Sequence, residues 1–188
     1  CFLTRAIISP RTVAVRGLRD SYAWHQFVWK AFPGRDGEAR DFLTRLDDKP
    51  QGTQLLVISP REPTPPEWLG SDDLWQTRPI PVGFFSQRNY RFQLRANPTV
   101  KKVVRDALGV RKKNGRREPV TDPAQLRIWL ERKGSACGFR ICEDAAVEFQ
   151  LGRRGFSKPP GSTSPARGTL HSVDITGMLT VTDPQLFH

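Results

Sequence analysis

The sequence contains little cysteine. Its three cysteines, Cys1, Cys137 and Cys142, are odd in number and lack the C-x-x-C spacing of a structural zinc site. This composition favours a reducing, cytoplasmic setting. No stretch approaches the roughly 18 apolar residues of a membrane span, and no positively charged, apolar signal segment opens the sequence. We therefore expect a cytoplasmic protein without a membrane span.

Motifs for several kinds of chemistry are also missing. There is no Walker-type glycine loop for nucleotide phosphates and no G-x-S-x-G elbow for a nucleophilic serine. The adjacent carboxylates Asp47–Asp48, Asp72–Asp73 and Glu143–Asp144 diverge on a strand and have no histidine nearby. We therefore expect no metal site and no cofactor.

What the sequence does have is an uneven positive charge. Its 188 residues include 30 Lys and Arg against 19 Asp and Glu, a formal net charge of +11. Residues 1–85 hold 11 basic and 10 acidic residues (net +1), whereas residues 86–188 hold 19 basic and 9 acidic residues (net +10). Charge needed only for solubility would be spread evenly. The asymmetry therefore favours a polyanionic partner, with nucleic acid ahead of an acidic membrane.

The order of elements in the first half predicts a split β-α-β unit. A Val/Arg-rich insertion leads to a helix that is capped by Asp20 or Ser21 and ends at Pro33–Gly34. A hairpin loop is expected over residues 47–52, and a loop or degenerate helix over the proline-rich residues 60–73. The expected strands are residues 2–9, 41–46, 53–59 and, at one edge, 74–82.

The second half is expected to repeat this order. A helix opens at Asp122 and Pro123, places Leu126 and Leu130 on one face, and ends at Gly134. The expected strands are residues 90–97, 145–152 and 168–181, with a basic loop after the first, and a second helix opens at 182–187. The predicted fold class is α+β, with two tandem ferredoxin-like (RRM-like, βαββαβ) domains over residues 1–85 and 86–188. The last strand of the second domain is absent, and we expect residues to be missing at both ends of the chain.

The segment "SYAWHQFVWKAF", Ser21–Phe32, predicts a helix with two usable faces. The core face, at i, i+3, i+4, i+7 spacing, consists of Trp24, Phe27, Val28 and Ala31. The opposite face consists of Tyr22, His25, Gln26 and Trp29. A lone histidine is usually structural or merely exposed, and burial between the domains is an alternative role for Tyr22 and Trp29.

His25 with Tyr22 at i−3 nevertheless presents a general acid/base beside a phenolic donor. Such a pair suits metal-free RNA cleavage, because the ribose 2′-hydroxyl supplies a nucleophile that DNA lacks. Cationic side chains must stabilise the charge on the phosphorane, and Lys30 and Lys158 are the candidates. His171 is expected to pack locally in its strand.

Three basic stretches are candidates for nucleic-acid contacts: residues 101–117, a hairpin over residues 153–167, and the strand at 90–97. The density of Arg and Lys in the first suits phosphates, and a basic hairpin is a reasonable probe for a groove. The candidate RNA-binding residues are Arg91, Arg95, Lys101, Lys102, Arg105, Arg111, Lys112, Lys113, Arg116, Arg117, Arg153, Arg154, Lys158 and Arg167.

The segments "RDSYAWHQFVWKAFPGRDGEARDFLTRLDD", "RFQLRANP" and "GMLTVTDP" together resemble the CasE family of CRISPR repeat-RNA endoribonucleases. The resemblance spans nearly the whole chain. It implies two ferredoxin-like domains and metal-independent cleavage at the base of a repeat hairpin, which leaves a 2′,3′-cyclic phosphate. By motif position, the family's catalytic histidine and tyrosine fall on His25 and Tyr22, and its basic hairpin falls on residues 153–167.

The same resemblance implies two kinds of partner. These are CRISPR repeat hairpin RNA, which stays bound after cleavage, and the other subunits of the Cascade complex; no membrane partner is expected. Family members end with a glycine-rich loop and strand, G-I-G-x-x-K-x-x-G-x-G-L-L, and the present sequence stops before that pattern. Two alternatives to a nuclease stay open: a non-catalytic RNA-binding module of paired ferredoxin-like domains, and a basic scaffold that binds nucleic acid non-specifically.

Overall fold

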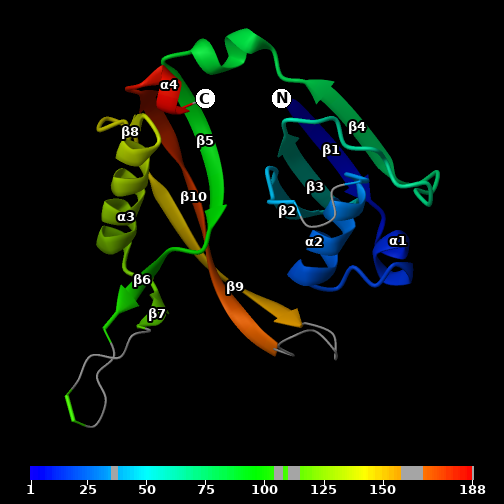
Figure 1. Cartoon of the computed structure of the whole chain (residues 1–188), viewed down its shortest axis with the longest axis horizontal. Coiled ribbons are helices and arrows are strands. Elements are labelled where there is room, and N and C mark those ends of the chain that lie inside the picture. Colours follow the sequence, from blue (N-terminus) through cyan, green and yellow to red (C-terminus); the bar gives the residue numbers. More distant parts are fainter. Residues whose placement is uncertain (35–37, 104–107, 110–114, 158–166, 188) are drawn as a thin grey trace. The chain divides into compact units, whose positions relative to one another are not determined.

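The structure is a computed structural model that describes residues 1–34, 38–103, 108–109, 115–157 and 167–187, without the side chains of Arg116, Arg154, Phe156, Ser157 and Arg167. It confirms an α+β fold with antiparallel sheets (Figure 1). The chain divides into two compact units, residues 1–82 with 155–168, and residues 83–154 with 169–188. Independent domains over residues 1–85 and 86–188 remain a prediction. No helix in the described ranges is both long and apolar enough to span a membrane.

The first unit is built on a four-stranded sheet. Its strands are β1 (Phe2–Ile8), β2 (Leu43–Lys49), β3 (Gly52–Ser59) and β4 (Leu74–Pro79). They lie in the order β2-β3-β1-β4 with every pair antiparallel, so β4 is the edge strand that the sequence predicts. Alternate β1 residues, Thr4, Ala6 and Ile8, are buried, as expected for a sheet with one face against a core.

Two helices follow β1. The insertion predicted before the main helix contains a short helix, α1 (Pro10–Val15), and the main helix is α2 (Ser21–Lys30). Trp24, Phe27 and Val28 of α2 are buried in the core of the first unit, which confirms the predicted apolar stripe. Burying each such side chain stabilises the fold by about 1.5–3 kcal/mol. This burial fixes which residues α2 turns away from the core.

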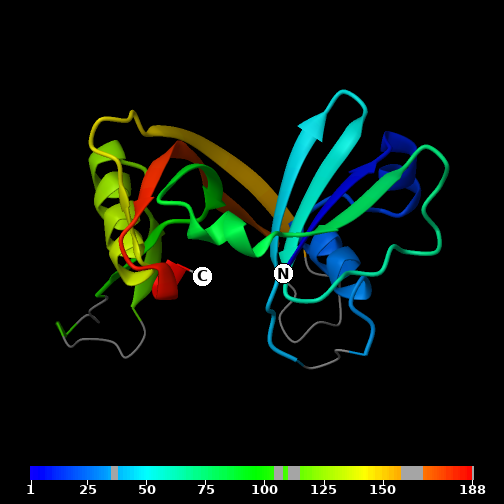
Figure 2. The same cartoon turned by 90° about the horizontal axis from the view of Figure 1, so that it is seen from above.

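The loop between β2 and β3 is shorter than predicted. The expected hairpin loop over residues 47–52 is wrong, because β2 continues to Lys49, which pairs with Gly52 across the turn at Pro50–Gln51. The Arg45 guanidinium binds the Asp47 carboxylate at 2.8 Å, and this ion pair lies within β2. Gly52 has a φ of +140°, and a side chain there would collide with the Ile8 carbonyl. Figure 2 shows the resulting tight hairpin.

The second unit contains a second antiparallel sheet. Its strands are β5 (Asn89–Ala96), β8 (Phe139–Ile141), β9 (Glu148–Ser157) and β10 (Arg167–Val181). The order is β5-β10-β8, and β9 also pairs with β10. The sequence did not predict β8, whose three residues are too few for an alternation signal. The helix α3 (Pro123–Ala136) buries Leu126 and Leu130 against Val173 and Ile175 of β10.

The end of α3 corrects a second prediction. Gly134 does not end the helix: it is buried inside α3, where a Cβ would collide with the Phe139 carbonyl and crowd its ring. The helix continues to Ala136, and Gly138 turns the chain with a φ of +73°. Gly134 therefore provides room for close packing, and Gly138 provides the turn.

Three short elements complete the fold. A 3₁₀ helix, η1 (Val82–Ser86), precedes β5, and α4 (Pro184–Phe187) forms where the sequence predicts the start of a helix. Part of the predicted basic loop is instead a two-stranded ladder of β6 (Thr99–Lys102) and β7 (Arg116–Pro119). An ion pair between Lys102 and Glu118 at 2.5 Å bridges this ladder.

Candidate functional site

His25 lies on the outer face of α2 and is oriented by Trp29, one helical turn later. Asp20 caps the helix, since one of its carboxylate oxygens accepts from the backbone N–H groups of Tyr22 and Ala23 at 3.0 and 2.9 Å. The Trp29 indole N–H donates to Nε2 of His25 at 2.9 Å, and the two rings meet edge to face. A neutral imidazole in this geometry carries its proton on Nδ1. The i, i+4 spacing on α2 therefore fixes both the orientation and the tautomer of His25.

Trp29 is itself anchored in the core of the first unit. Its ring lies 5.0 Å from that of buried Phe42, which stacks on Phe32 at 4.9 Å. The sequence places Trp29 on the His25 face and leaves burial between domains as its alternative role. The structure shows that the half-buried indole donates its N–H to the His25 imidazole, whereas burial between the domains stays a prediction.

The pKa of His25 is lowered from its usual value of 6.5. Partial burial is the main cause, and the positive charge of Arg40 adds to it. The Arg40 Nε–H donates to the Phe42 carbonyl at 2.8 Å, and its guanidinium lies over the Phe42 ring. The Trp29 hydrogen bond acts in the same direction, because only unprotonated Nε2 can accept it. His25 is therefore held neutral near physiological pH, and Arg40 is a cation near this site that the sequence reasoning did not identify.

Tyr22 and Lys30 lie on the same helix. Tyr22 is half-buried, and among the described residues its hydroxyl makes no hydrogen bond. Lys30 is the last residue of α2 and is exposed. The predicted catalytic roles of His25, Tyr22 and Lys30 remain predictions, for which the helix provides a shared scaffold.

The basic residues of β5 differ from each other. Arg91 is exposed, whereas Arg95 is only partly exposed and binds both carboxylate oxygens of Asp174 on β10 at 2.8 and 2.7 Å. A bidentate pair of this kind neutralises the guanidinium and ties β5 to β10. Arg91 is therefore the better placed of the two for a phosphate, although both remain predicted contacts.

The other predicted RNA contacts lie on two ladders or outside the described residues. Lys101, Lys102 and Arg117 are exposed on β6 and β7, and Arg153 is exposed on β9. For three more, the backbone lies in a strand and the side chain is not described: Arg116, Arg154 and Arg167. The predicted contacts that lie outside the described residues are Arg105, Arg111, Lys112, Lys113 and Lys158.

Three of the carboxylates noted in the sequence have structural partners: Asp47 pairs with Arg45, Glu143 with Arg140, and Asp73 with Ser9, Gly70 and Thr12. Burial raises the pKa of the Asp73 carboxyl, but hydrogen bonds from Ser9, Gly70 and Thr12 outweigh it and lower the pKa overall. The bonds from the Ser9 N–H and the Thr12 hydroxyl, 2.7 and 2.9 Å long, tie the start of α1 to the loop before β4. Within the described residues, no group of three or more His, Cys, Asp or Glu side chains could hold a metal ion.

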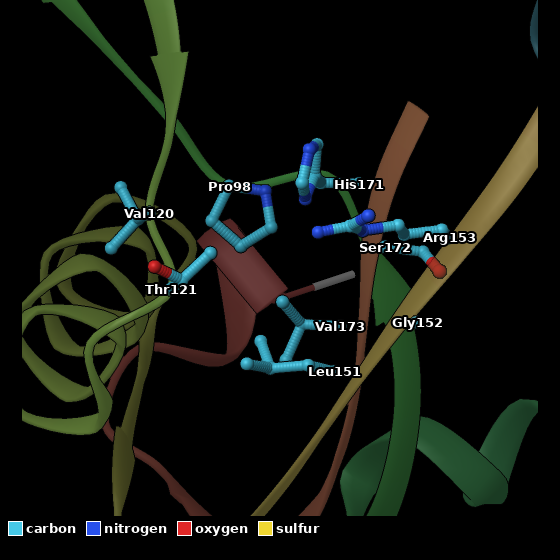
Figure 3. A pocket seen from close by; sticks show the side chains of 9 residues that line it. All are labelled: Pro98, Val120, Thr121, Leu151, Gly152, Arg153, His171, Ser172 and Val173. Carbon is cyan, nitrogen blue, oxygen red and sulfur yellow. The ribbon is translucent and has the colours of Figure 1, made fainter. Parts of the chain in front are cut away.

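A pocket of about 410 Å³ lies inside the second unit (Figure 3). Arg153 and His171 lie on one side of it, and Val120 and Thr121 face them. The expectation that His171 simply packs in its strand is therefore incomplete, because its half-buried ring lines a cavity. The sequence alone gives no signal of this, since the lining residues come from four separate segments.

Comparison with known proteins agrees with this fold. The family model described as "CRISPR associated protein" matches residues 1–188. The chain belongs to the CasE/Cse3 family of CRISPR-associated proteins.

Two characterised relatives are distant. The CRISPR-associated endoribonuclease Cse3 of Thermus thermophilus is 26% identical over 147 residues, which cover 76% of this chain and 65% of the relative. The chain thus matches somewhat less than two thirds of that protein's length. The Cascade subunit CasE of Escherichia coli is 29% identical over 182 residues, which cover 94% of this chain and 85% of the relative.

A solved structure extends the likeness to three dimensions. Thermus thermophilus Cse3 bound to an RNA representing a pre-cleavage complex superposes with a TM-score of 0.73 at 25% identity. The superposition covers 99% of this chain and 87% of that one.

Proposed function

We propose that the chain is a metal-independent endoribonuclease that cleaves CRISPR repeat hairpin RNA. The observation that supports this most directly is His25: a histidine on the outer face of α2, oriented by Trp29, held neutral by burial and Arg40, and placed one turn after Tyr22. A neutral imidazole near pH 7 is the form that a general base needs. The names of the relatives, an endoribonuclease and a Cascade subunit, agree with this proposal.

The reaction uses the RNA's own hydroxyl as nucleophile. The ribose 2′-oxygen attacks the adjacent phosphorus and loses its proton, while the departing 5′-oxygen gains one, which gives a 2′,3′-cyclic phosphate and a 5′-hydroxyl end. His25 serves as general acid/base and Tyr22 as a hydroxyl donor close to it. Since Nε2 already accepts from Trp29, it must exchange the indole for the RNA hydroxyl before it can take the proton. Lys30, Lys158 and Arg40 are the cations proposed to stabilise the phosphorane.

The fold and the partners belong to the same proposal. The sheet order β2-β3-β1-β4, with α2 between β1 and β2, is that of a ferredoxin-like unit. The order β5-β10-β8, with α3 between β5 and β8, repeats the order β1-β3-β2 of the first unit. The described residues contain no counterpart of β4 beside β5, and β9 pairs with β10 as an additional strand. We therefore interpret the chain as tandem ferredoxin-like domains that retain the processed RNA and assemble with other Cascade subunits.

A cleavage assay in EDTA tests the proposal. A repeat-hairpin RNA should be cut at one position, and the product should carry a 2′,3′-cyclic phosphate. A 2′-deoxy substitution 5′ of the scissile phosphate should abolish cleavage and leave binding nearly unchanged. Activity that is lost in EDTA and restored by magnesium or manganese would contradict the mechanism, as would normal cleavage of the deoxy substrate.

One observation favours a second candidate, a non-catalytic RNA-binding module. In the free chain, the Nε2 lone pair of His25 is already occupied by Trp29, as it would be in a purely structural histidine. Under that alternative, His25→Ala leaves every RNA-dependent activity unchanged, whereas the nuclease proposal requires a large loss of cleavage.

A further inference from the structure

The pocket in Figure 3 exists because two strands separate. β5 pairs with β10 from Asn89 to Ala96, and the last pair joins Ala96 to Val173. Pro98, which has no backbone N–H, then leads the chain away into β6. The edge of β10 beyond Val173, at His171 and Ser172, therefore lies next to the gap that β5 leaves, and this gap is the pocket.

The apolar floor of the pocket is held in place by a backbone hydrogen bond. The Val120 N–H donates to the Pro98 carbonyl at 2.9 Å, which joins the segment after β7 to the segment after β5. Pro98, Val120 and Val173 are buried, so they form a firm apolar floor. The residues around the floor do not depend on how the two units are placed, because all of them belong to the second unit.

The pocket combines an apolar floor with a guanidinium, an imidazole and hydroxyl groups. Leu151 on β9 extends the floor. Arg153 contributes a guanidinium and His171 contributes ring nitrogens, while Thr121 and Ser172 contribute hydroxyls. Among the described residues that line it, none carries a carboxylate. Its volume of about 410 Å³ lies within the range of small-ligand sites.

We propose that this pocket binds one unpaired nucleotide of the RNA, with the base against the floor of Pro98, Val120 and Leu151 and the adjoining phosphate at Arg153 and His171. A base has a large apolar face and polar edges, which match the floor and the hydroxyls. Its phosphate matches the Arg153 guanidinium, and the His171 ring can donate a hydrogen bond to it. A paired base is stacked inside the duplex and cannot enter a pocket of this kind. The inference rests on the proposed function, because it assumes that the partner is RNA.

The test compares two RNAs and one matched pair of variants. The first RNA is a repeat hairpin with single-stranded flanks, and the second is a blunt duplex of the same stem without unpaired nucleotides. Leu151→Trp fills the pocket from a residue that is 54% exposed, and Leu170→Trp places the same ring on β10 at a 41% exposed residue that does not line it. Thr121→Trp, from an exposed loop residue, is a second filling variant in case Leu151→Trp does not fold. Affinities are measured by fluorescence anisotropy, and folding by circular dichroism.

We expect Leu151→Trp to weaken binding of the flanked hairpin about 5- to 100-fold, the range that one bound base contributes. Binding of the blunt duplex should stay within about twofold, and Leu170→Trp should change neither affinity. His171→Ala should also weaken binding of the flanked hairpin more than binding of the blunt duplex, but by a smaller factor than Leu151→Trp.

Other results are equally decisive. Equal weakening on both RNAs, or no weakening of the flanked hairpin by either filling variant, overturns the nucleotide pocket. If the wild type binds AMP or UMP, loses it in Leu151→Trp, and shows no difference between the RNAs, the pocket takes a free nucleotide and the RNA assignment is wrong. If the wild type binds neither RNA, the proposed function fails, which is a separate outcome.

Discussion

His25 and Trp29 are joined by a hydrogen bond on α2, and in the proposed mechanism the histidine reacts and the tryptophan positions it. Replacing His25 with Ala should lower the cleavage rate about 10²- to 10⁴-fold, the usual loss for a general acid/base. RNA affinity should change little, because a neutral imidazole contributes little to phosphate binding. Single-turnover cleavage and anisotropy titrations separate the two effects.

Tyr22→Phe provides the comparison for that prediction. It keeps the ring on α2 and removes only the hydroxyl, so its cleavage defect should be the smaller one. A larger defect in Tyr22→Phe than in His25→Ala would reverse the roles proposed for these two residues.

Trp29→Phe should change the pH dependence of cleavage. The variant keeps an aromatic ring against Phe42 and loses the N–H that only neutral His25 can accept. The pKa of His25, which burial and Arg40 hold below 6.5, should therefore rise. Because the neutral base is the active form in the proposed mechanism, the acidic limb of the kcat/KM profile should move to higher pH, and the rate loss should be greatest at low pH.

Trp68→Phe is the matched control for the pH effect. Trp68 packs on the same core, with its ring 5.3 Å from that of Phe27. It should leave the acidic limb in place, and NMR titration of the His25 ring should show the shift only in Trp29→Phe. An unchanged His25 pKa in Trp29→Phe would remove Trp29 from the mechanism and leave it a packing role alone.

At the scale of elements, α2 depends on its N-terminal cap. Asp20→Ala removes the acceptor for two backbone N–H groups and should lower the free energy of unfolding by about 0.5–2 kcal/mol, measured by urea denaturation. Cleavage should fall much less than in His25→Ala, because the Trp29 hydrogen bond forms further along the helix.

Asp122→Ala is the equivalent change at α3, where the carboxylate accepts from the Gln125 N–H at 2.9 Å. It should cost a similar amount of stability without touching the α2 site. If Asp20→Ala abolished cleavage while Asp122→Ala did not, Asp20 itself would have to act on the RNA.

The β9–β10 hairpin should dominate the dependence of RNA binding on salt. Neutralising Arg153, Arg154 and Lys158 together should make the slope of log affinity against log salt shallower by up to about 3, since each phosphate contact contributes about 0.9. The larger loss should fall on the cognate hairpin. Neutralising Lys112 and Lys113 should weaken cognate and random RNA alike, as contacts to backbone alone do. A triple mutant with the wild-type slope and preference would exclude the hairpin as a groove probe.

At the scale of the whole molecule, charge belongs to the second half. Residues 86–188 have 19 basic against 9 acidic residues (net +10), and residues 1–85 are nearly balanced at 11 against 10 (net +1). Neutralising the exposed Arg11, Arg61 and Arg78 should therefore change RNA affinity by less than about threefold in a titration at fixed salt. The matched triple of Arg91, Lys101 and Arg117 should lose more. Equal losses would mean that the RNA also lies along the first unit.

The sequence by itself determined the elements whose patterns are long and locally consistent. The stripe of Trp24, Phe27 and Val28 and a cap at Asp20 or Ser21 predict α2, and the structure has the stripe and places the cap at Asp20. Short or strained features were not predictable in the same way. β8 has three residues, and Gly134 has the composition of a helix end although packing against Phe139 keeps it inside α3.

The tertiary structure decided which groups lie near His25, namely the Trp29 indole N–H and Arg40. Helical spacing alone places Trp29 on the histidine's face, but the direction of the indole N–H depends on how its ring packs against Phe42, which is distant in the sequence. The approach of Arg40 and the pocket beside His171 likewise arise from segments that only the folded chain brings together. Local patterns fix helices and charge because they depend on neighbouring residues, whereas pKa shifts and cavities depend on the packing of distant ones.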